Sequence, residues 1–188
     1  MLYLVGGASR AGKSFVARKL LAQHGIPYFS TDILMMGFVN GYPGFGLDPD
    51  DSGVERGEML WPILRAMAVN ILEEAVTHPT YLLEGDALLP AHVAELAHTY
   101  ARQVRACFMG YARIDPVAKL HIVRRFEQDW FSAYADDEMI AYLADQAEFS
   151  RYIQRECAAH GLAYFDCSED LPGTVDQVVE YLLSAAER

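Results

Sequence analysis

Residues 7–14 read GASRAGKS and match the pattern GxxxxGK[ST] at every fixed position. Glycines near the two ends permit turns in which backbone N–H groups point inward, and the start of a following helix adds positive potential. In such a loop the lysine reaches the β- and γ-phosphates of a nucleotide, and the final hydroxyl binds Mg²⁺. The pattern therefore predicts a site for a nucleoside triphosphate and magnesium. The residues expected to form it are Gly7, Ala8, Ser9, Arg10, Ala11, Gly12, Lys13 and Ser14, with Ser14 as the metal ligand.

A carboxylate follows the second apolar run, PYFS at 27–30. If that run is a strand, Asp32 lies beyond its carboxyl end, where open α/β sheets bind their ligands. There the carboxylate can accept the proton of an attacking hydroxyl group or hold a magnesium-bound water. The alternative is that Asp32 caps a helix beginning at residues 33–36, a position that aspartate favours.

Two more carboxylates follow the third apolar run, because Glu84 and Asp86 flank a glycine at the end of TYLLE. Residues two apart in an extended chain lie on the same side. We therefore expect Glu84 and Asp86 to face the magnesium ion or the acceptor of the phosphate. The alternative is a structural carboxylate that accepts hydrogen bonds from loop amides.

Two adjacent arginines, Arg124 and Arg125, end a helix expected over 116–126. Phosphoryl transfer spreads negative charge over the moving group, and an arginine there stabilises it. Neighbouring helical residues point about 100° apart, so one of the two is expected to face the site. We expect residues 121–150 to act as a lid, in which Trp130 and Phe131 either pack the lid or belong to the core.

Residues 37–57 contain six of the 14 glycines and are too long for an ordinary connection between elements. We expect this segment to enclose the acceptor. Arg56 is its only cation, which favours an anionic acceptor. Tyr42 and Phe45 offer aromatic rings that could instead stack on a nucleobase.

Short apolar runs alternate with helical patterns along the whole chain, which predicts strands buried on both faces of a parallel sheet. The fold expected for residues 1–188 is therefore a single three-layer α/β domain with right-handed crossovers. The expected strands are 2–5, 27–30, 80–84, 104–109 and 162–166, and the main helices are 13–24, 60–76, 90–101, 116–126, 137–159 and 173–187.

The formal net charge of −11 argues against a nucleic-acid partner, which would require a basic face. No apolar run approaches the roughly 20 residues of a membrane helix, and the N-terminus has no secretory signal. The cysteines Cys107, Cys157 and Cys167 show no spacing typical of disulfide frameworks or zinc sites. We expect a cytoplasmic protein with no membrane partner, and the sequence leaves its oligomeric state open.

In their order, these features resemble the small P-loop kinases of the nucleotide and metabolite kinase group, which includes shikimate, gluconate and adenylate kinases. Locally, FSTD at 29–32 and LLEGDALLP at 82–90 are similar to stretches of 2-phosphoglycerate kinases. The resemblance implies a parallel sheet in the order 2-3-1-4-5, ATP and Mg²⁺ as cofactors, a closing lid and an adenine-binding loop near 166–173.

The sequence thus favours an ATP- and Mg²⁺-dependent kinase whose partner is a small-molecule acceptor. Lys13, Asp32 and one of the arginines Arg124 and Arg125 would act in catalysis, while Asp32, Arg56, Glu84 and Asp86 would contact the acceptor. Two alternatives stay open. One is a nucleoside or nucleotide kinase with a base pocket under residues 37–57. The other is a nucleotide-binding regulatory or toxin-like protein whose ATP state controls a partner protein.

Overall fold

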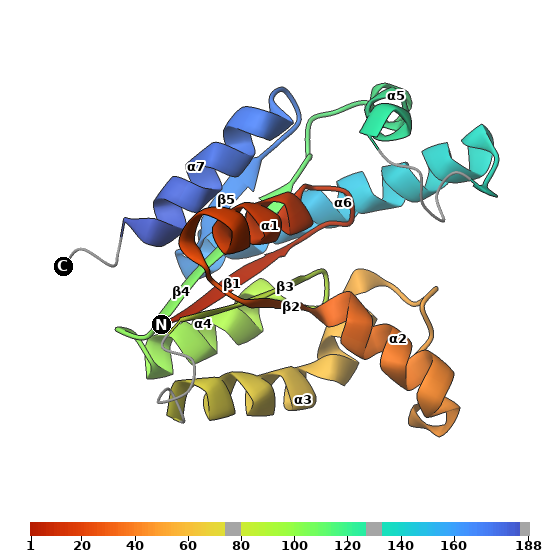
Figure 1. Ribbon diagram of the computed structural model, residues 1–188. Coiled ribbons are helices and arrows are strands. Elements are labelled where there is room, and N and C mark those ends of the chain that lie inside the picture. Colours follow the sequence, from red (N-terminus) through yellow and green to blue (C-terminus); the bar gives the residue numbers. More distant parts are fainter. Residues whose placement is uncertain (74–79, 127–132, 185–188) are drawn as a thin grey trace.

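The computed structural model describes residues 1–73, 80–126 and 133–184. Within these residues all strands belong to one parallel sheet with the order β2-β3-β1-β4-β5, which confirms the order implied by the family resemblance (Figure 1). The strands are β1 (Leu2–Gly7), β2 (Tyr28–Ser30), β3 (Tyr81–Gly85), β4 (Val104–Gly110) and β5 (Ala163–Asp166).

Helices connect these strands as the alternating pattern predicts. Glycines in the left-handed conformation end two of them, Gly25 after the first and Gly161 after the longest. The helices are α1 (Lys13–His24), α2 (Thr31–Gly41), α3 (Gly53–Glu73), α4 (Pro90–Thr99), α5 (Pro116–Phe126), α6 (Asp136–His160) and α7 (Leu171–Leu183), with a short 3₁₀ turn η1 (Pro43–Phe45).

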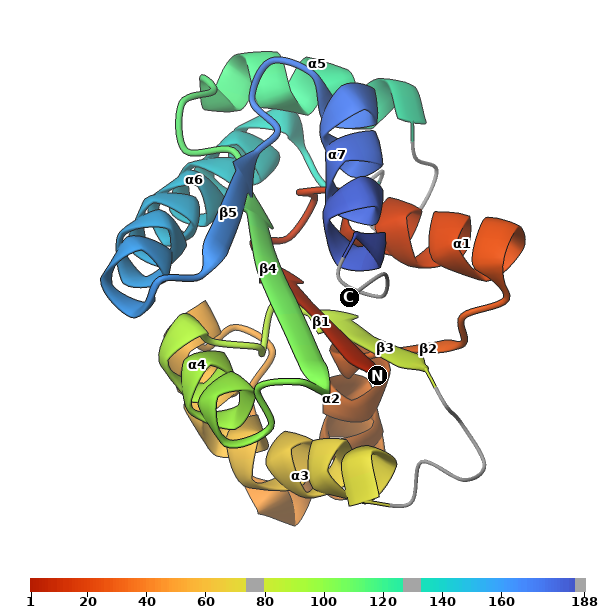
Figure 2. The same ribbon diagram turned by 90° about the vertical axis from the view of Figure 1, so that its left-hand side faces the viewer.

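The sheet separates two layers of helices and two apolar cores. Alternate residues of β1 point to opposite faces, so Tyr3 and Val5 enter one core while Leu2 and Leu4 enter the other. Helices α1 and α7 cover the first face, and α3 and α4 cover the second (Figures 1 and 2). The N-terminal half of α6 packs in the first core and its C-terminal half in the second. This is the three-layer α/β architecture that the sequence predicts.

The glycine-rich segment 37–57 differs from the expected long loop. Its first residues complete α2, and α3 begins at Gly53, so the irregular part is limited to residues 42–52 around η1. The rings of Phe38 and Phe45 stack with centroids 4.4 Å apart, which holds the end of α2 against η1. Aromatic packing thus overrides the low helix propensity of glycine here.

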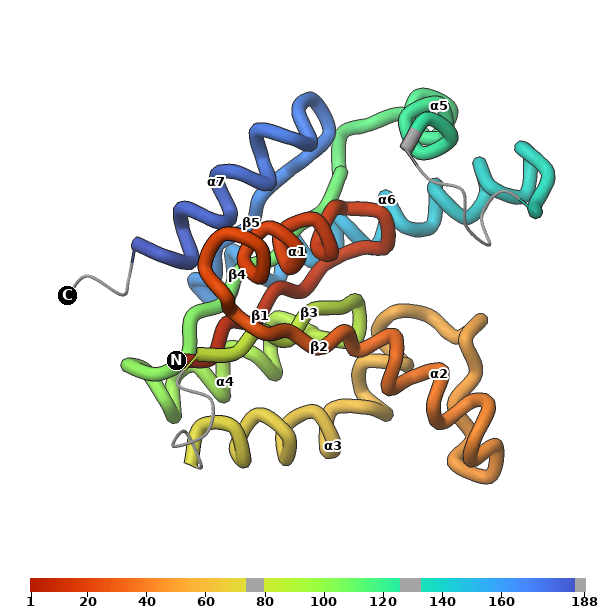
Figure 3. Tube along the Cα trace, in the orientation of Figure 1, coloured from red at the N-terminus to blue at the C-terminus, as the bar shows by residue number. Residues whose placement is uncertain are grey.

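Two arms flank the loop that joins β1 to α1. In the tube of Figure 3, α2 and residues 42–52 lie on one side of this loop, while α5 and the start of α6 lie on the other. In the described ranges no helix is both long enough and apolar enough to cross a membrane.

Candidate functional site

The loop over residues 7–14, called the P-loop below, connects the carboxyl end of β1 to α1. Its two outer glycines are required by close approach and by backbone conformation. A Cβ atom on Gly7, where φ is 134°, would lie 1.9 Å from the Met109 carbonyl oxygen. Gly12 has φ 98° and precedes the first turn of α1. At both glycines the chain adopts a backbone conformation that L-residues rarely adopt.

Lys13 is buried and its ammonium group lies over the P-loop. Nζ donates hydrogen bonds to the carbonyl oxygens of Gly7 at 3.0 Å and Ala8 at 2.8 Å. The side chain therefore folds back across the loop instead of extending into solvent. The positive charge of Lys13 is thus held beside the backbone of the loop.

Ser14 and Glu84 bring the P-loop together with the end of β3. The Ser14 hydroxyl donates to Glu84 Oε1 at 3.3 Å, and Glu84 is 2% exposed. A hydroxyl and a carboxylate are oxygen ligands of the kind that Mg²⁺ prefers. No group of three or more His, Cys, Asp and Glu side chains is arranged for a metal within the described ranges.

Asp32 lies in the first turn of α2 and shares the electrostatic environment of Lys13, Glu84 and Asp86. The helix begins at Thr31 after Ser30, and no side chain caps it, so the alternative that Asp32 is an N-cap is wrong. The side chain is exposed, although the surrounding walls of the site desolvate its carboxyl group. This desolvation, followed by repulsion from Asp86, raises the pKa of Asp32 to about 6.

Arg56 and Asp86 form a buried ion pair, and their side chains are 9% and 11% exposed. Arg56 Nη2 donates to Asp86 Oδ2 at 2.7 Å. The other terminal nitrogen, Nη1, donates to the Pro49 carbonyl at 2.9 Å and to the Asp51 carbonyl. The sequence selected both charged residues, but it did not predict that they pair with each other. The terminal nitrogens of Arg56 are thus already occupied by protein oxygens.

Helix α6 supplies contacts to the P-loop that the sequence did not indicate. The Ser9 N–H donates to Gln146 Oε1 at 2.9 Å across 137 residues of sequence. The Tyr142 hydroxyl, one turn earlier, is hydrogen-bonded to the Ser9 side chain and lies within electrostatic reach of Arg56 and Asp86. Neither residue belongs to a motif, so no local signal could have found them.

Lys119 on α5 is a further residue to which sequence reasoning assigned no specific role. Its ammonium group donates to the Arg10 carbonyl at 2.8 Å and lies 4.2 Å from the centre of the Tyr111 ring. Burial lowers the pKa of Lys119. In the sequence, Lys119 could have been selected because it lies in the basic stretch 102–125, which contains six cations and one acid.

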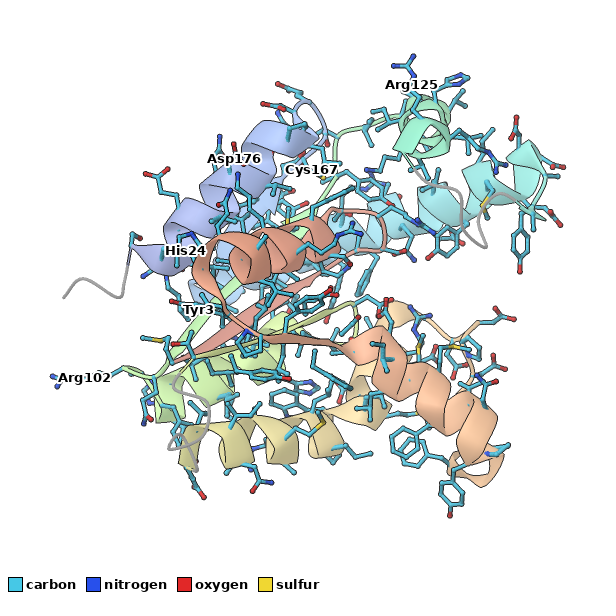
Figure 4. All side chains as sticks on the ribbon, viewed as in Figure 1. Tyr3, His24, Arg102, Arg125, Cys167 and Asp176 are labelled. Carbon is cyan, nitrogen blue, oxygen red and sulfur yellow. The ribbon has the colours of Figure 1, made fainter. Side chains whose placement is uncertain are left out.

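The arginines of the expected lid point in different directions. Arg124 donates to the Tyr134 carbonyl at 2.8 Å and to Asp136 Oδ1 at 3.0 Å, which ties the end of α5 to the start of α6. Arg125 is exposed and points outward from α5, away from the P-loop (Figure 4). The hypothesis on Trp130 and Phe131 falls outside the described residues.

No protein-family model matches the chain, and no curated protein matches it in sequence. Several solved structures are similar over nearly the whole chain. A gluconokinase from Sinorhizobium meliloti 1021 has 18% identity and a TM-score of 0.60, covering 98% of this chain and 93% of that one. A shikimate kinase from Bacteroides thetaiotaomicron has 16% identity and a TM-score of 0.52, covering 98% of both chains.

A third similar structure is a sugar kinase from Janibacter sp. HTCC2649, with 14% identity and a TM-score of 0.56. The match covers 96% of this chain and 93% of the sugar kinase. At these identities the likeness defines the fold and no more. The protein has the α/β fold of small metabolite kinases, as its motifs led us to expect.

Proposed function

We propose that the protein is a kinase that transfers a phosphoryl group from ATP to a hydroxyl group of a small metabolite. One observation carries this proposal. A complete P-loop lies at the same edge of the sheet as Asp32 and Glu84, and its serine is hydrogen-bonded to Glu84. These groups correspond to a phosphate cradle, a metal ligand set and a base, the parts that phosphoryl transfer requires.

The P-loop residues would hold the triphosphate, with their N–H groups and Lys13 facing its oxygens. Ser14 and Glu84 would hold Mg²⁺, Ser14 directly and Glu84 directly or through water. When bound, the metal ion supplies charge neutralisation at the phosphate oxygens. Glu84 is buried and accepts the hydrogen bond of the Ser14 hydroxyl, so it also fixes the direction of that hydroxyl.

Asp32 would act on the acceptor. Its carboxylate takes the proton of the acceptor hydroxyl as the oxygen attacks the γ-phosphorus atom, while the bond from that phosphorus to the β–γ bridging oxygen breaks. The products are ADP and a phosphate monoester. A pKa of about 6 leaves most of the group ionised at neutral pH and makes it a stronger base than an ordinary aspartate.

Residues 37–57 and the arginines of α5 complete the proposal. The arm formed by α2, residues 42–52 and the start of α3 would enclose the acceptor. The buried ion pair of Arg56 and Asp86 would form one side of the acceptor site. Arg124 or Arg125 would approach the transferring phosphate when α5 moves toward the P-loop. Arg124 then leaves its contacts with Tyr134 and Asp136.

The test combines binding and turnover on the full chain. A non-hydrolysable ATP analogue with Mg²⁺ should raise the melting temperature, because a ligand of the folded state stabilises it. A panel of hydroxyl metabolites should include compounds that release ADP from ATP. Lys13→Ala should abolish both effects, while Lys19→Ala, at a half-buried surface position on α1, should retain them.

Three results would contradict the proposal in different ways. Full activity of Lys13→Ala would exclude the P-loop mechanism. Stimulation by nucleoside monophosphates alone would favour a nucleotide kinase. ATP binding without any accepted small molecule, together with an ATP-dependent protein partner, would favour the regulatory alternative.

A further inference from the structure

The charges around the acceptor side of the site are strongly unequal. The segments that frame it are 31–57 and 81–90, and together they contain seven Asp and Glu residues. Arg56 is the single Lys or Arg among them. The P-loop side is basic in comparison, since residues 1–31 contain four cations and no acid.

The terminal nitrogens of Arg56 already have partners within the protein. Its Nη2 is bonded to Asp86, its Nη1 to the carbonyls of Pro49 and Asp51, and its side chain is 9% exposed. An acceptor carboxylate could take over Nη2 only by displacing the buried Asp86, which would leave a buried negative charge unpaired, and Nε, which has no hydrogen-bond partner among the described residues, is itself buried. The one cation of these segments therefore stabilises the fold through its contacts with Asp86, Pro49 and Asp51.

We propose that the acceptor carries no anionic group and is a neutral polyol or an amino alcohol, an inference that rests on the kinase function proposed above. Arg56 already neutralises Asp86, so an anionic acceptor would meet Asp32 and the other acids of these segments together with the charge of the triphosphate. A neutral hydroxyl compound avoids this repulsion, and an ammonium group is attracted by the same carboxylates. The expectation of an anionic acceptor, drawn from Arg56 in the sequence, is replaced by this one.

Matched acceptors that differ mainly in charge test the proposal. One set is sorbitol, glucamine and gluconate, and a second is glycerol, 2-aminopropane-1,3-diol and glycerate, within a wider panel of hydroxyl compounds. We expect kcat/KM for the neutral or amino member to exceed that of the acid at least about tenfold. The KM of an amine should rise with salt while that of the neutral compound stays constant, because salt screens charge.

Two outcomes of this test would overturn the inference on the acceptor. Accepted compounds that are confined to carboxylates or phosphates would overturn the inference and leave the kinase function intact. ATP binding with no accepted compound in the whole panel would overturn the inference and the proposed kinase function together.

A different observation concerns how the P-loop keeps its shape. Arg10 has φ 63° and is the one non-glycine residue with positive φ in the described ranges. Its carbonyl accepts a hydrogen bond from Lys119, which is 2% exposed and held over the Tyr111 ring. In a trans peptide the N–H group points opposite to the carbonyl. The Ala11 N–H therefore points away from Lys119 into the loop, where Ala8 O now lies 3.3 Å away.

We infer that Lys119 is a positioning residue, which acts through the Arg10 peptide to aim the Ala11 N–H at a bound phosphate. This inference also rests on the proposed nucleotide site. Lys119 also lies close to Cys167, the residue that follows β5. Figure 4 shows Cys167 in the interior beside α1 and α7.

The test measures the affinity for a magnesium-bound, non-hydrolysable ATP analogue by calorimetry. Lys119→Met should weaken binding at least about tenfold, and Lys119→Arg should restore most of it. Arg10→Gly in the Lys119→Met background should recover part of the loss, because glycine adopts positive φ without help. A merely structural lysine would not show this recovery.

Lys19→Met is the matched control, since that lysine is paired with Asp176 on the surface. If Lys119→Met does not fold, Lys119→Gln replaces it in the same pair of measurements. Unchanged affinity, or a loss that Arg10→Gly does not reduce, would overturn the role of Lys119. A wild-type chain that binds no nucleotide would instead overturn the proposed nucleotide site and this role with it.

Discussion

The Ser14 hydroxyl donates a hydrogen bond to Glu84 Oε1 at 3.3 Å and thereby joins the start of α1 to the end of β3. Seventy residues separate the two in sequence. They meet because β1 and β3 are neighbours and pair in register, Gly6 opposite Gly85. The ends of adjacent parallel strands thus create the oxygen pair on which the proposed magnesium site depends.

Glu84→Gln should raise the Mg²⁺ concentration needed for half-maximal activity about 10–100-fold, the range typical of groups that orient metal ligands. A carboxamide keeps the size of the side chain but lacks the charge that a hard cation prefers. The measurement is ADP release across a magnesium titration. Glu95→Gln, on the exposed side of α4, is the control, and an unchanged magnesium requirement in Glu84→Gln would remove Glu84 from the site.

Asp32→Asn should lower kcat about 10²–10⁴-fold with little effect on the affinity for ATP, since general-base catalysis contributes that much. In the wild type, kcat/KM should fall as pH decreases through about 6, where Asp32 takes up a proton. The asparagine variant should lack this acid limb. Asp145→Asn, an exposed aspartate on α6, is the control. If kcat/KM of Asp32→Asn still falls as pH decreases through about 6, the group that titrates there is not Asp32.

The raised pKa of Asp32 also makes the stability of the fold depend on pH. The pKa of Asp32 is higher in the folded chain than its ordinary value, so the folded state binds this proton more tightly than the unfolded state. Ionisation therefore opposes folding, and this contribution grows as pH rises from about 4 to 6. Asp32→Asn should melt at a higher temperature than the wild type at pH 8 and at the same temperature near pH 3. A lower melting temperature at pH 8 would contradict this.

The buried pair of Arg56 and Asp86 should show strong coupling. Asp86→Asn leaves the guanidinium buried without its counter-charge and should lower the free energy of unfolding by about 3–5 kcal/mol. Asp86→Leu combined with Arg56→Met removes both charges and should cost less than either single change. Urea unfolding measures each variant. Asp176→Asn breaks the exposed pair with Lys19 and should cost less than about 1 kcal/mol.

The elements that dominate the fold were predictable because their signals are local. The P-loop pattern, the apolar runs and the first-turn prolines Pro90 and Pro116 lie within single segments, and α1 and α5 have the bounds that the sequence indicates. The candidate carboxylates Asp32, Glu84 and Asp86 followed from one rule, that ligands bind beyond the carboxyl ends of parallel strands. The structure brings these carboxylates together with Lys13.

Contacts between distant segments could not be predicted in this way. Lys119 meets Arg10 across 109 residues and Gln146 meets Ser9 across 137, and neither pair leaves a pattern in the sequence. Arg56 was singled out for its charge, but its partner depends on how α3 packs beside β3. The helical start of segment 37–57 was missed for a related reason. Tertiary packing of Phe38 on Phe45 decides it against the propensity of glycine.

Two glycines near Asp32 should respond oppositely to substitution by alanine. Gly37 lies inside α2 with open space around its Cβ position, so Gly37→Ala should stabilise the protein by about 0.5–1 kcal/mol. Gly85 has φ 154°, and a Cβ there would lie 1.7 Å from Thr31 Oγ1. Strained backbone alone costs about 1–3 kcal/mol, and the overlap with Thr31 adds to it.

Urea unfolding of both variants checks the pair. Thr31→Ala in the Gly85→Ala background removes the hydroxyl oxygen and should recover the part of the loss that comes from overlap, while the part from backbone strain remains. Because Gly85 lies between Glu84 and Asp86, Gly85→Ala should also abolish ADP release, whereas Gly37→Ala should keep it. Equal stability of the two variants would mean that the β3–α2 contact is looser than the close approach of Thr31 to Gly85 indicates.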